Sequence, residues 1–249
     1  MKPNRHLIVN ADDFGRSAGI NQGIMTAHGS GIVTSASLMV CWPAAHEAAS
    51  YGLRYPELSL GLHIDLGEWT YKESAWRPVY EVVQLTDHAA VAKETERQLA
   101  HFIRFVGREP THIDSHQHIH RSEPVYSILK EMACVLGVPL RQYTSGINYN
   151  GHFYGQTSQG RSTSDAISTS SLCSIVMNLP PGVTELSCHP GCGKETPPPY
   201  QDEREIEMRA LCSPEVHTVI ADEEIQLYSF HDFATPRSDA NVLQGNEAI

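Results

Sequence analysis

The most informative residues are four histidines and one aspartate within nine positions that begin at His112. Imidazole and carboxylate side chains bind transition metals and transfer protons. On an extended strand alternate residues share a face, so His112, Asp114 and His116 would point the same way. His118 and His120 would continue the row if the strand runs on. The spacing favours a metal or proton-transfer site over a solvated strand end with hydrogen-bonded histidines.

Two adjacent carboxylates, Asp12 and Asp13, follow the apolar run 7–10. In an extended chain their side chains would point to opposite sides. One could then bind a metal while the other accepts a proton from water. The alternative is a helix-capping aspartate and a turn aspartate before Gly15.

Two further histidines stand in polar motifs. His63 and Asp65 would share a strand face, with His63 as a metal ligand and Asp65 orienting it. The alternative is a buried histidine bonded to the neighbouring carboxylate. His189 precedes a sharp Pro-Gly turn and is a candidate general acid for a leaving amine. It lies between Cys188 and Cys192, but no second cysteine pair supports a zinc site there.

Strand-like and helix-like segments alternate along the chain, which predicts a mostly parallel sheet with helices outside it. About seven strands indicate an α/β barrel or near-barrel. We expect strands at 7–10, 32–40, 58–65, 111–115, 138–143, 183–188 and 225–230. We expect helices capped by Ser17, Asp87, Ser122 and Ser213, a helix over 165–177, an aromatic loop after 65, and a long loop over 144–163.

The chain is expected to form one domain over 1–234, followed by a disordered tail over 235–249. Its 18 basic and 29 acidic residues give a net charge of −11, which argues against nucleic acid and anionic membranes as partners. No apolar run approaches a membrane span and no signal-peptide core is present, so we expect a cytoplasmic protein with reduced cysteines. The composition leaves open whether the chain forms a homo-oligomer.

The candidate residues share one placement along the predicted fold. Asp12 with Asp13, His63, His116 and His189 each fall at the C-terminal end of a predicted strand. Active sites of α/β barrels lie at that end. We therefore expect these five residues to meet on one rim.

Together these motifs resemble the YdjC-like family of carbohydrate deacetylases, which includes chitooligosaccharide deacetylases and a hopanoid-associated branch. The matching stretches are 7–15, 31–35, 61–63, 110–120 and 188–190. The resemblance implies an irregular (β/α) barrel that binds a divalent metal. It also implies hydrolysis of the N-acetyl group of an amino sugar or oligosaccharide.

By this resemblance the metal ligands are Asp13, His63 and His116, the base is Asp12 and the acid is His189. His118 and His120 stay open as residues that share the acid role. Two nitrogens and one oxygen suit zinc and other transition metals, whereas magnesium prefers oxygen, so the metal stays open between Mg and Zn. Two alternatives remain: another metal hydrolase, such as a phosphoesterase or cyclic amidase, and a non-catalytic sugar-binding protein.

Overall fold

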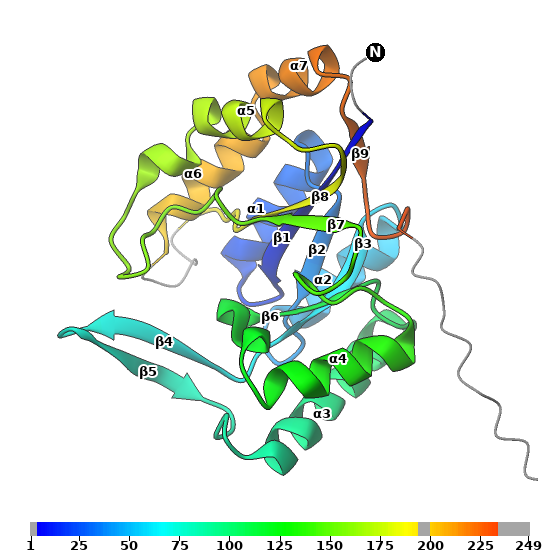
Figure 1. Ribbon diagram of the computed structural model, residues 1–249, viewed down its shortest axis with the longest axis vertical. Helices are drawn as coiled ribbons and strands as arrows, with labels where there is room; N and C mark the ends of the chain where they lie inside the picture. The colour runs from blue at the N-terminus through cyan, green and yellow to red at the C-terminus, as the bar shows by residue number, and fades with distance from the viewer. Residues whose placement is uncertain (1–3, 194–199, 234–249) are drawn as a thin grey trace, which may run out of the picture.

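The computed structural model describes residues 4–193 and 200–233, and the expected tail at 235–249 lies outside them. At the centre is a curled, parallel sheet in the order β6-β3-β2-β1-β8-β7, with β9 beside β1 (Figure 1). Its strands are β1 (Arg5–Phe14), β2 (Ser35–Leu38), β3 (Ser59–Ile64), β6 (Ile113–Ser115), β7 (Ile147–Asn150), β8 (Gly182–Cys188) and β9 (Gln226–Tyr228). The expectation of about seven mostly parallel strands is confirmed.

Seven α-helices in the described ranges pack around the sheet: α1 (Ala18–Ser30), α2 (Ala45–Arg54), α3 (His88–Val106), α4 (Val125–Leu136), α5 (Thr169–Met177), α6 (Asp202–Leu211) and α7 (Pro214–Asp222). Neighbouring helices touch in the order α4-α3-α2-α1-α6-α5-α7. The sheet does not close among the described strands, because β6 and β7 each have one neighbour, so it forms a half-barrel. None of the described helices combines the length and apolar character needed to cross a bilayer.

Local sequence explains most helix ends. The side chains of Ser17, Asp87 and Ser213 accept hydrogen bonds from the first turns of α1, α3 and α7, as expected. The expected cap at Ser122 is wrong: its N–H bonds to Ile119 at the end of the preceding 3-10 helix η1 (His116–Arg121), and α4 begins after Pro124 without a side-chain cap.

The strand expected over 138–143 is also wrong. Only Leu140 makes a bridge, to Ile113, and its own N–H is taken by the hydroxyl of Thr144. Pro139 has no N–H to offer a neighbouring strand. The segment therefore turns away after one bridge.

Two expected loops contain strands. The aromatic segment forms an antiparallel hairpin, β4 (Gly67–Lys72) and β5 (Ala75–Glu81), which projects from the body beside α3 (Figure 1). The segment 144–163 contributes β7 to the sheet edge. The helix expected over 165–177 is split into the 3-10 helix η2 (Ser164–Ile167) and α5, where Ser168 caps α5.

Candidate metal and active site

The parallel register brings the sequence motifs to one rim. In the β1–β8 pair Ala11 lies opposite Cys188, so Asp12 and His189 are neighbours. In the β3–β6 pair His63 lies opposite Asp114. The expected convergence of Asp12, Asp13, His63, His116 and His189 on a single cavity is therefore observed.

Asp13 reaches the cavity through an unusual backbone. Its φ of 67° lies in the left-handed region, and the β1–β2 pairing is irregular between Ala11 and Phe14. The expectation that Asp12 and Asp13 point to opposite sides is wrong, because this turn directs both carboxylates into the same cavity. A non-glycine residue with positive φ stores strain, which is common at functional sites.

Asp13, His63 and His116 present three donor atoms that all lie within 4.8 Å of one another. Asp13 Oδ1 is 3.0 Å from His116 Nδ1 and 3.4 Å from His63 Nε2. Ligands bound to one ion at about 2.1 Å lie about 3.0–3.4 Å apart. The Nε2 atom of His63 is buried, and no residue in the described part of the chain forms a hydrogen bond with it. Spacing, burial and donor type thus fit a divalent ion.

His63 is oriented from behind by Asp114. Its Nδ1 lies 2.7 Å from Asp114 Oδ1, an arrangement that commonly fixes the ring of a metal-binding histidine. The expectation that Asp65 orients His63 is wrong. Asp65 instead accepts hydrogen bonds from the Trp42 indole and the Tyr80 hydroxyl.

Arginines neutralise the second oxygen of Asp13. Arg204 donates to Asp13 Oδ2, and Arg16 lies 3.9 Å from the same atom. Burial alone would raise the pKa of Asp13, but the charges of Arg204 and His116 hold the pKa well below its usual value. Asp13 is therefore an ionised carboxylate.

Asp12 is ionised for a parallel reason. Arg141 donates to both of its oxygens at 2.7 Å, and burial, which raises the pKa of Asp12, is outweighed by this arginine. Arg141 also contacts Asp114 and Glu185 at 2.7 Å each. Asp12, His63 and Asp114 form a second group of potential metal donors, but its two carboxylates are already paired with the Arg141 guanidinium. The first group fits a metal better.

His189 lines the same cavity beside Asp12. Its Nε2 is 3.7 Å from Asp12 Oδ2, and its Nδ1 is buried without a hydrogen-bond partner in 4–193 and 200–233. Burial lowers the pKa of His189 to about 4, so the ring is neutral near pH 7.

The other histidines of the 112–120 run diverge. The strand does not run on past Ser115, so His118 and His120 do not continue its face: η1 follows at His116, and Gln117 and His118 within it adopt left-handed φ values of 50° and 54°. His118 still lines the cavity and bonds to the hydroxyl of Tyr149 at 3.1 Å, whereas His120 bonds to Ser115. His112 is buried behind Asp114, stacked on Phe230.

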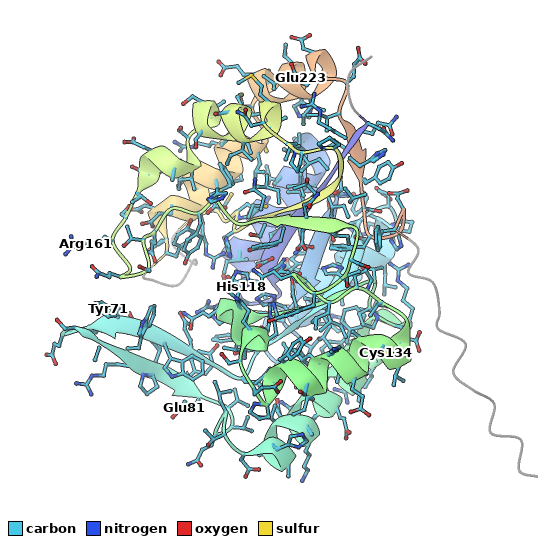
Figure 2. All side chains as sticks on the ribbon, in the orientation of Figure 1. Tyr71, Glu81, His118, Cys134, Arg161 and Glu223 are labelled. Atoms are coloured by element: carbon cyan, nitrogen blue, oxygen red, sulfur yellow. The ribbon has the colours of Figure 1, made fainter. Side chains whose placement is uncertain are left out.

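The cavity holds about 870 Å³ and opens between the sheet rim and the hairpin. Aromatic side chains line it: Trp69, Tyr71 and Trp76 on the hairpin, and Tyr149, Tyr154 and Tyr200 opposite. Figure 2 shows His118 between the sheet and the hairpin that carries Tyr71. The amide of Gln117 bonds to both the N–H and the C=O of Trp69 at 2.9 Å, which connects the hairpin to the histidine segment.

Sequence reasoning missed three charged residues of the site. Glu68 lies 3.8 Å from His116 Nε2 and pairs with Arg16, while Arg204 and Glu207 extend from α6. The sequence does contain one signal for the residues of α6. Glu203 and Glu207 lie on the same helical face as the apolar Ala210, and carboxylates on a buried helix face indicate polar partners there.

Comparison with known proteins identifies the family of the chain. Residues 6–222 match the family of YdjC-like proteins, and the chain belongs to that family. The family named from the motifs is thereby confirmed.

Two relatives carry names that state an activity. The carbohydrate deacetylase of Geobacillus stearothermophilus is 30% identical, over 92% of this chain and 98% of its own length. The chitooligosaccharide deacetylase of Serratia marcescens is 30% identical, over 91% and 98%. Deacetylases of this kind are hydrolases of amide bonds, which agrees with the class of enzyme expected from the motifs.

Solved structures share the fold. A candidate cellobiose-phosphate cleavage protein from Enterococcus faecalis superimposes with a TM-score of 0.75 and 25% identity, over 93% of this chain and 99% of that one. A family 4 carbohydrate esterase from Streptomyces lividans, solved with acetate, gives 0.54 at 11% identity, over 95% and 100%. At that identity the second likeness concerns the fold alone.

Proposed function

We propose that the chain is a metal-dependent deacetylase that hydrolyses the N-acetyl group of an N-acetylated amino sugar or oligosaccharide and releases acetate. The observation that carries the proposal is the meeting of Asp13, His63 and His116 beside Asp12, a separate ionised carboxylate. A metal-dependent hydrolase needs a donor set for the ion and a spare base, and this cavity contains both. The names of the two relatives support the same reaction.

Asp13, His63 and His116 would hold the metal. A divalent ion bound by them would supply Lewis-acid polarisation of the acetamide carbonyl and would lower the pKa of an attacking water. Arg204 and Asp114 keep the carboxylate and the His63 ring in position. Two nitrogens and one oxygen suit zinc and similar transition metals better than magnesium, and the identity of the ion stays open.

Asp12 is assigned as the general base. Its bonds to Arg141 hold the pKa of Asp12 below the usual value, so the group is ionised, as a base must be before it accepts a proton. His189 is assigned as the acid for the leaving amine. Since burial keeps its ring neutral, His189 must gain a proton during turnover, and Asp12 Oδ2 lies 3.7 Å from its Nε2.

The cavity lining supports a sugar substrate. Aromatic rings on two sides offer flat apolar surfaces for sugar rings, and hydroxyl, amide and histidine groups between them offer hydrogen bonds. A phosphoesterase is less well supported, because two of the three arginines that line the cavity, Arg16 and Arg204, are already ion-paired with carboxylates.

The test is an acetate-release assay over a panel of N-acetylated mono- and oligosaccharides, with and without chelator. We expect release of acetate and a free amine in equal amounts, abolished by chelation and restored by a divalent metal. Release of phosphate from phosphorylated sugars, without acetate from any N-acetylated sugar, would contradict the proposal. Sugar binding without turnover of any substrate in the panel would contradict it as well.

A further inference from the structure

Helix α6 holds the backbone of His189 by both of its polar groups. Glu207 Oε2 accepts a hydrogen bond from the His189 N–H at 2.5 Å, and Arg204 Nη1 donates to the His189 C=O at 3.4 Å. The Gly191 N–H bonds in turn to the C=O of Arg204 at 3.1 Å. Three hydrogen bonds thus connect one turn of α6 to the segment that carries the imidazole.

The imidazole of His189 lacks an equivalent anchor. Its Nδ1 has no hydrogen-bond partner among the described residues, and the 3.7 Å between Nε2 and Asp12 Oδ2 is too long for a hydrogen bond. Its ring packs edge-on against two tyrosine rings, with centroid distances of 5.2 Å to Tyr154 and 5.8 Å to Tyr200. In contrast to His63, which a carboxylate orients through Nδ1, His189 takes its position from its backbone and from aromatic walls.

The hydroxyl of Tyr200 orients the carboxylate of Glu207, which in turn holds the backbone of His189. This hydroxyl donates to Glu207 Oε1 and accepts the N–H of Gly155 at 2.5 Å. The ring of Tyr200 stacks on Tyr154 at 4.9 Å with an interplanar angle of 8°. Glu207 is completely buried, so both of its oxygens depend on these partners.

On its other side, the segment after His189 packs closely against α1, where Gly191 lies next to Gly23. A Cβ atom placed on Gly23 of α1 would lie 2.3 Å from the Cα of Gly191. The segment therefore cannot move closer to α1, to which it is also bonded through the Cys192 N–H and the Gly19 C=O at 2.8 Å, so α1 and α6 hold it from two sides.

We propose that Glu207 is a positioning residue for His189 and that the Tyr200 hydroxyl holds Glu207 in the orientation this requires. The inference rests on the proposed function, in which His189 protonates the leaving amine. Loss of the Glu207 contact would displace the imidazole relative to Asp12 and the substrate nitrogen. A misplacement of about 1 Å costs on the order of 100-fold in rate, whereas substrate binding on the hairpin side is unaffected.

The test compares four variants of the full-length protein loaded with metal. Glu207→Ala should lower kcat by at least about tenfold and leave KM within about twofold. Glu207→Gln should keep most of the activity, because its amide oxygen can still accept the His189 N–H. Tyr200→Phe keeps the stacked ring but loses the hydroxyl, and should lower kcat by a smaller factor. Glu203→Gln, a buried carboxylate one turn earlier in α6, is the matched control and should behave as wild type.

A second readout does not depend on turnover. The ring ¹⁵N signals of His189, assigned with His189→Gln, should shift in Glu207→Ala and stay unchanged in Glu203→Gln. Wild-type kcat in Glu207→Ala, or an equal loss in the alanine and glutamine variants, would overturn the inference. If wild type releases no acetate, the proposed function fails, and the NMR comparison alone decides whether Glu207 positions His189.

Discussion

Arg141 and Asp12 form a two-pronged ion pair, with Nη1 to Oδ2 and Nη2 to Oδ1 both at 2.7 Å. The same guanidinium contacts Asp114, which orients His63. Arg141 thus connects Asp12, the proposed base, to Asp114, the carboxylate that orients the proposed metal ligand His63. The carboxylates of Asp12, Asp114 and Glu185 share one buried positive charge there.

Replacement of Asp12 should separate chemistry from metal binding. Asp12→Asn removes a proton acceptor but none of the proposed metal donors, so acetate release should fall by about 100- to 10,000-fold while the metal content stays at one ion per chain. Steady-state kinetics and elemental analysis measure the two quantities. Near-normal turnover would rule out Asp12 as the base.

Replacement of Arg141 should be read as a loss of stability. Arg141→Met leaves the buried carboxylates of Asp12, Asp114 and Glu185 without their shared counter-charge, and breaking a buried pair typically costs about 3–5 kcal/mol. Urea denaturation should show this drop in the free energy of unfolding. Arg161→Met, at an exposed loop position, is the control and should change it by less than about 0.5 kcal/mol.

Loss of His116 should remove metal and activity together. His116→Ala deletes one of three donors, so the purified protein should hold clearly less than one ion per chain and release no acetate. His217→Ala, an exposed histidine on α7, should keep both. Full metal occupancy in His116→Ala would exclude His116 as a ligand.

His112 should make the fold sensitive to acid. Burial lowers the pKa of His112 to about 3, below its usual value near 6.5, so the folded state favours the neutral ring. The contribution of this neutral ring to the free energy of unfolding is fully present above pH 6.5 and is lost as the pH falls toward 3. It amounts to about 1.4 kcal/mol for each pH unit between the pKa values of the unfolded and folded states.

His112→Gln, which stays neutral, should therefore show a smaller decrease in unfolding free energy between pH 7 and pH 4.5 than wild type. His118 and His120 also have lowered pKa values, so some decrease remains. Urea titrations at several pH values give the two slopes. Equal slopes would mean that His112 is protonated without cost in the folded protein.

Trp76 should contribute to sugar binding without contributing to the fold. It lines the cavity, is 56% exposed and packs edge-on against Tyr71 at 5.6 Å. Trp76→Ala should raise KM for an N-acetylated oligosaccharide by about 3- to 10-fold and leave the thermal midpoint unchanged. Val79→Ala, similarly exposed on the same strand, is the matched control. Unchanged KM values for every sugar tested would exclude a role for this ring.

The sequence predicted the strand ends well because the chemistry there follows directly after buried apolar runs. Asp12 and His63 lie near the ends of continuously buried β-strands and His189 directly follows one, so the runs that form these strands are local signals for their positions. The parallel sheet and the convergence of these residues on one cavity could be predicted for that reason.

The remainder depends on contacts between distant segments. Arg204 meets Asp13 across 191 residues, and nothing near either residue in the sequence indicates the partner. The left-handed backbone at Asp13 and His118 was not expected, because neither position is a glycine. The hairpin leaves no strand signal in the sequence, because the side chains of β5 lack the alternation of a half-buried strand.

The contact between Gly23 and Gly191 gives the first helix an unusual intolerance to change. Alanine is the better helix former, and at residue 23 it would suit α1 taken by itself. Its methyl group would nevertheless overlap the turn two residues beyond His189. Natural selection for catalysis should therefore act on this outer-helix position as strictly as on a reactive side chain, although it contributes no functional group of its own.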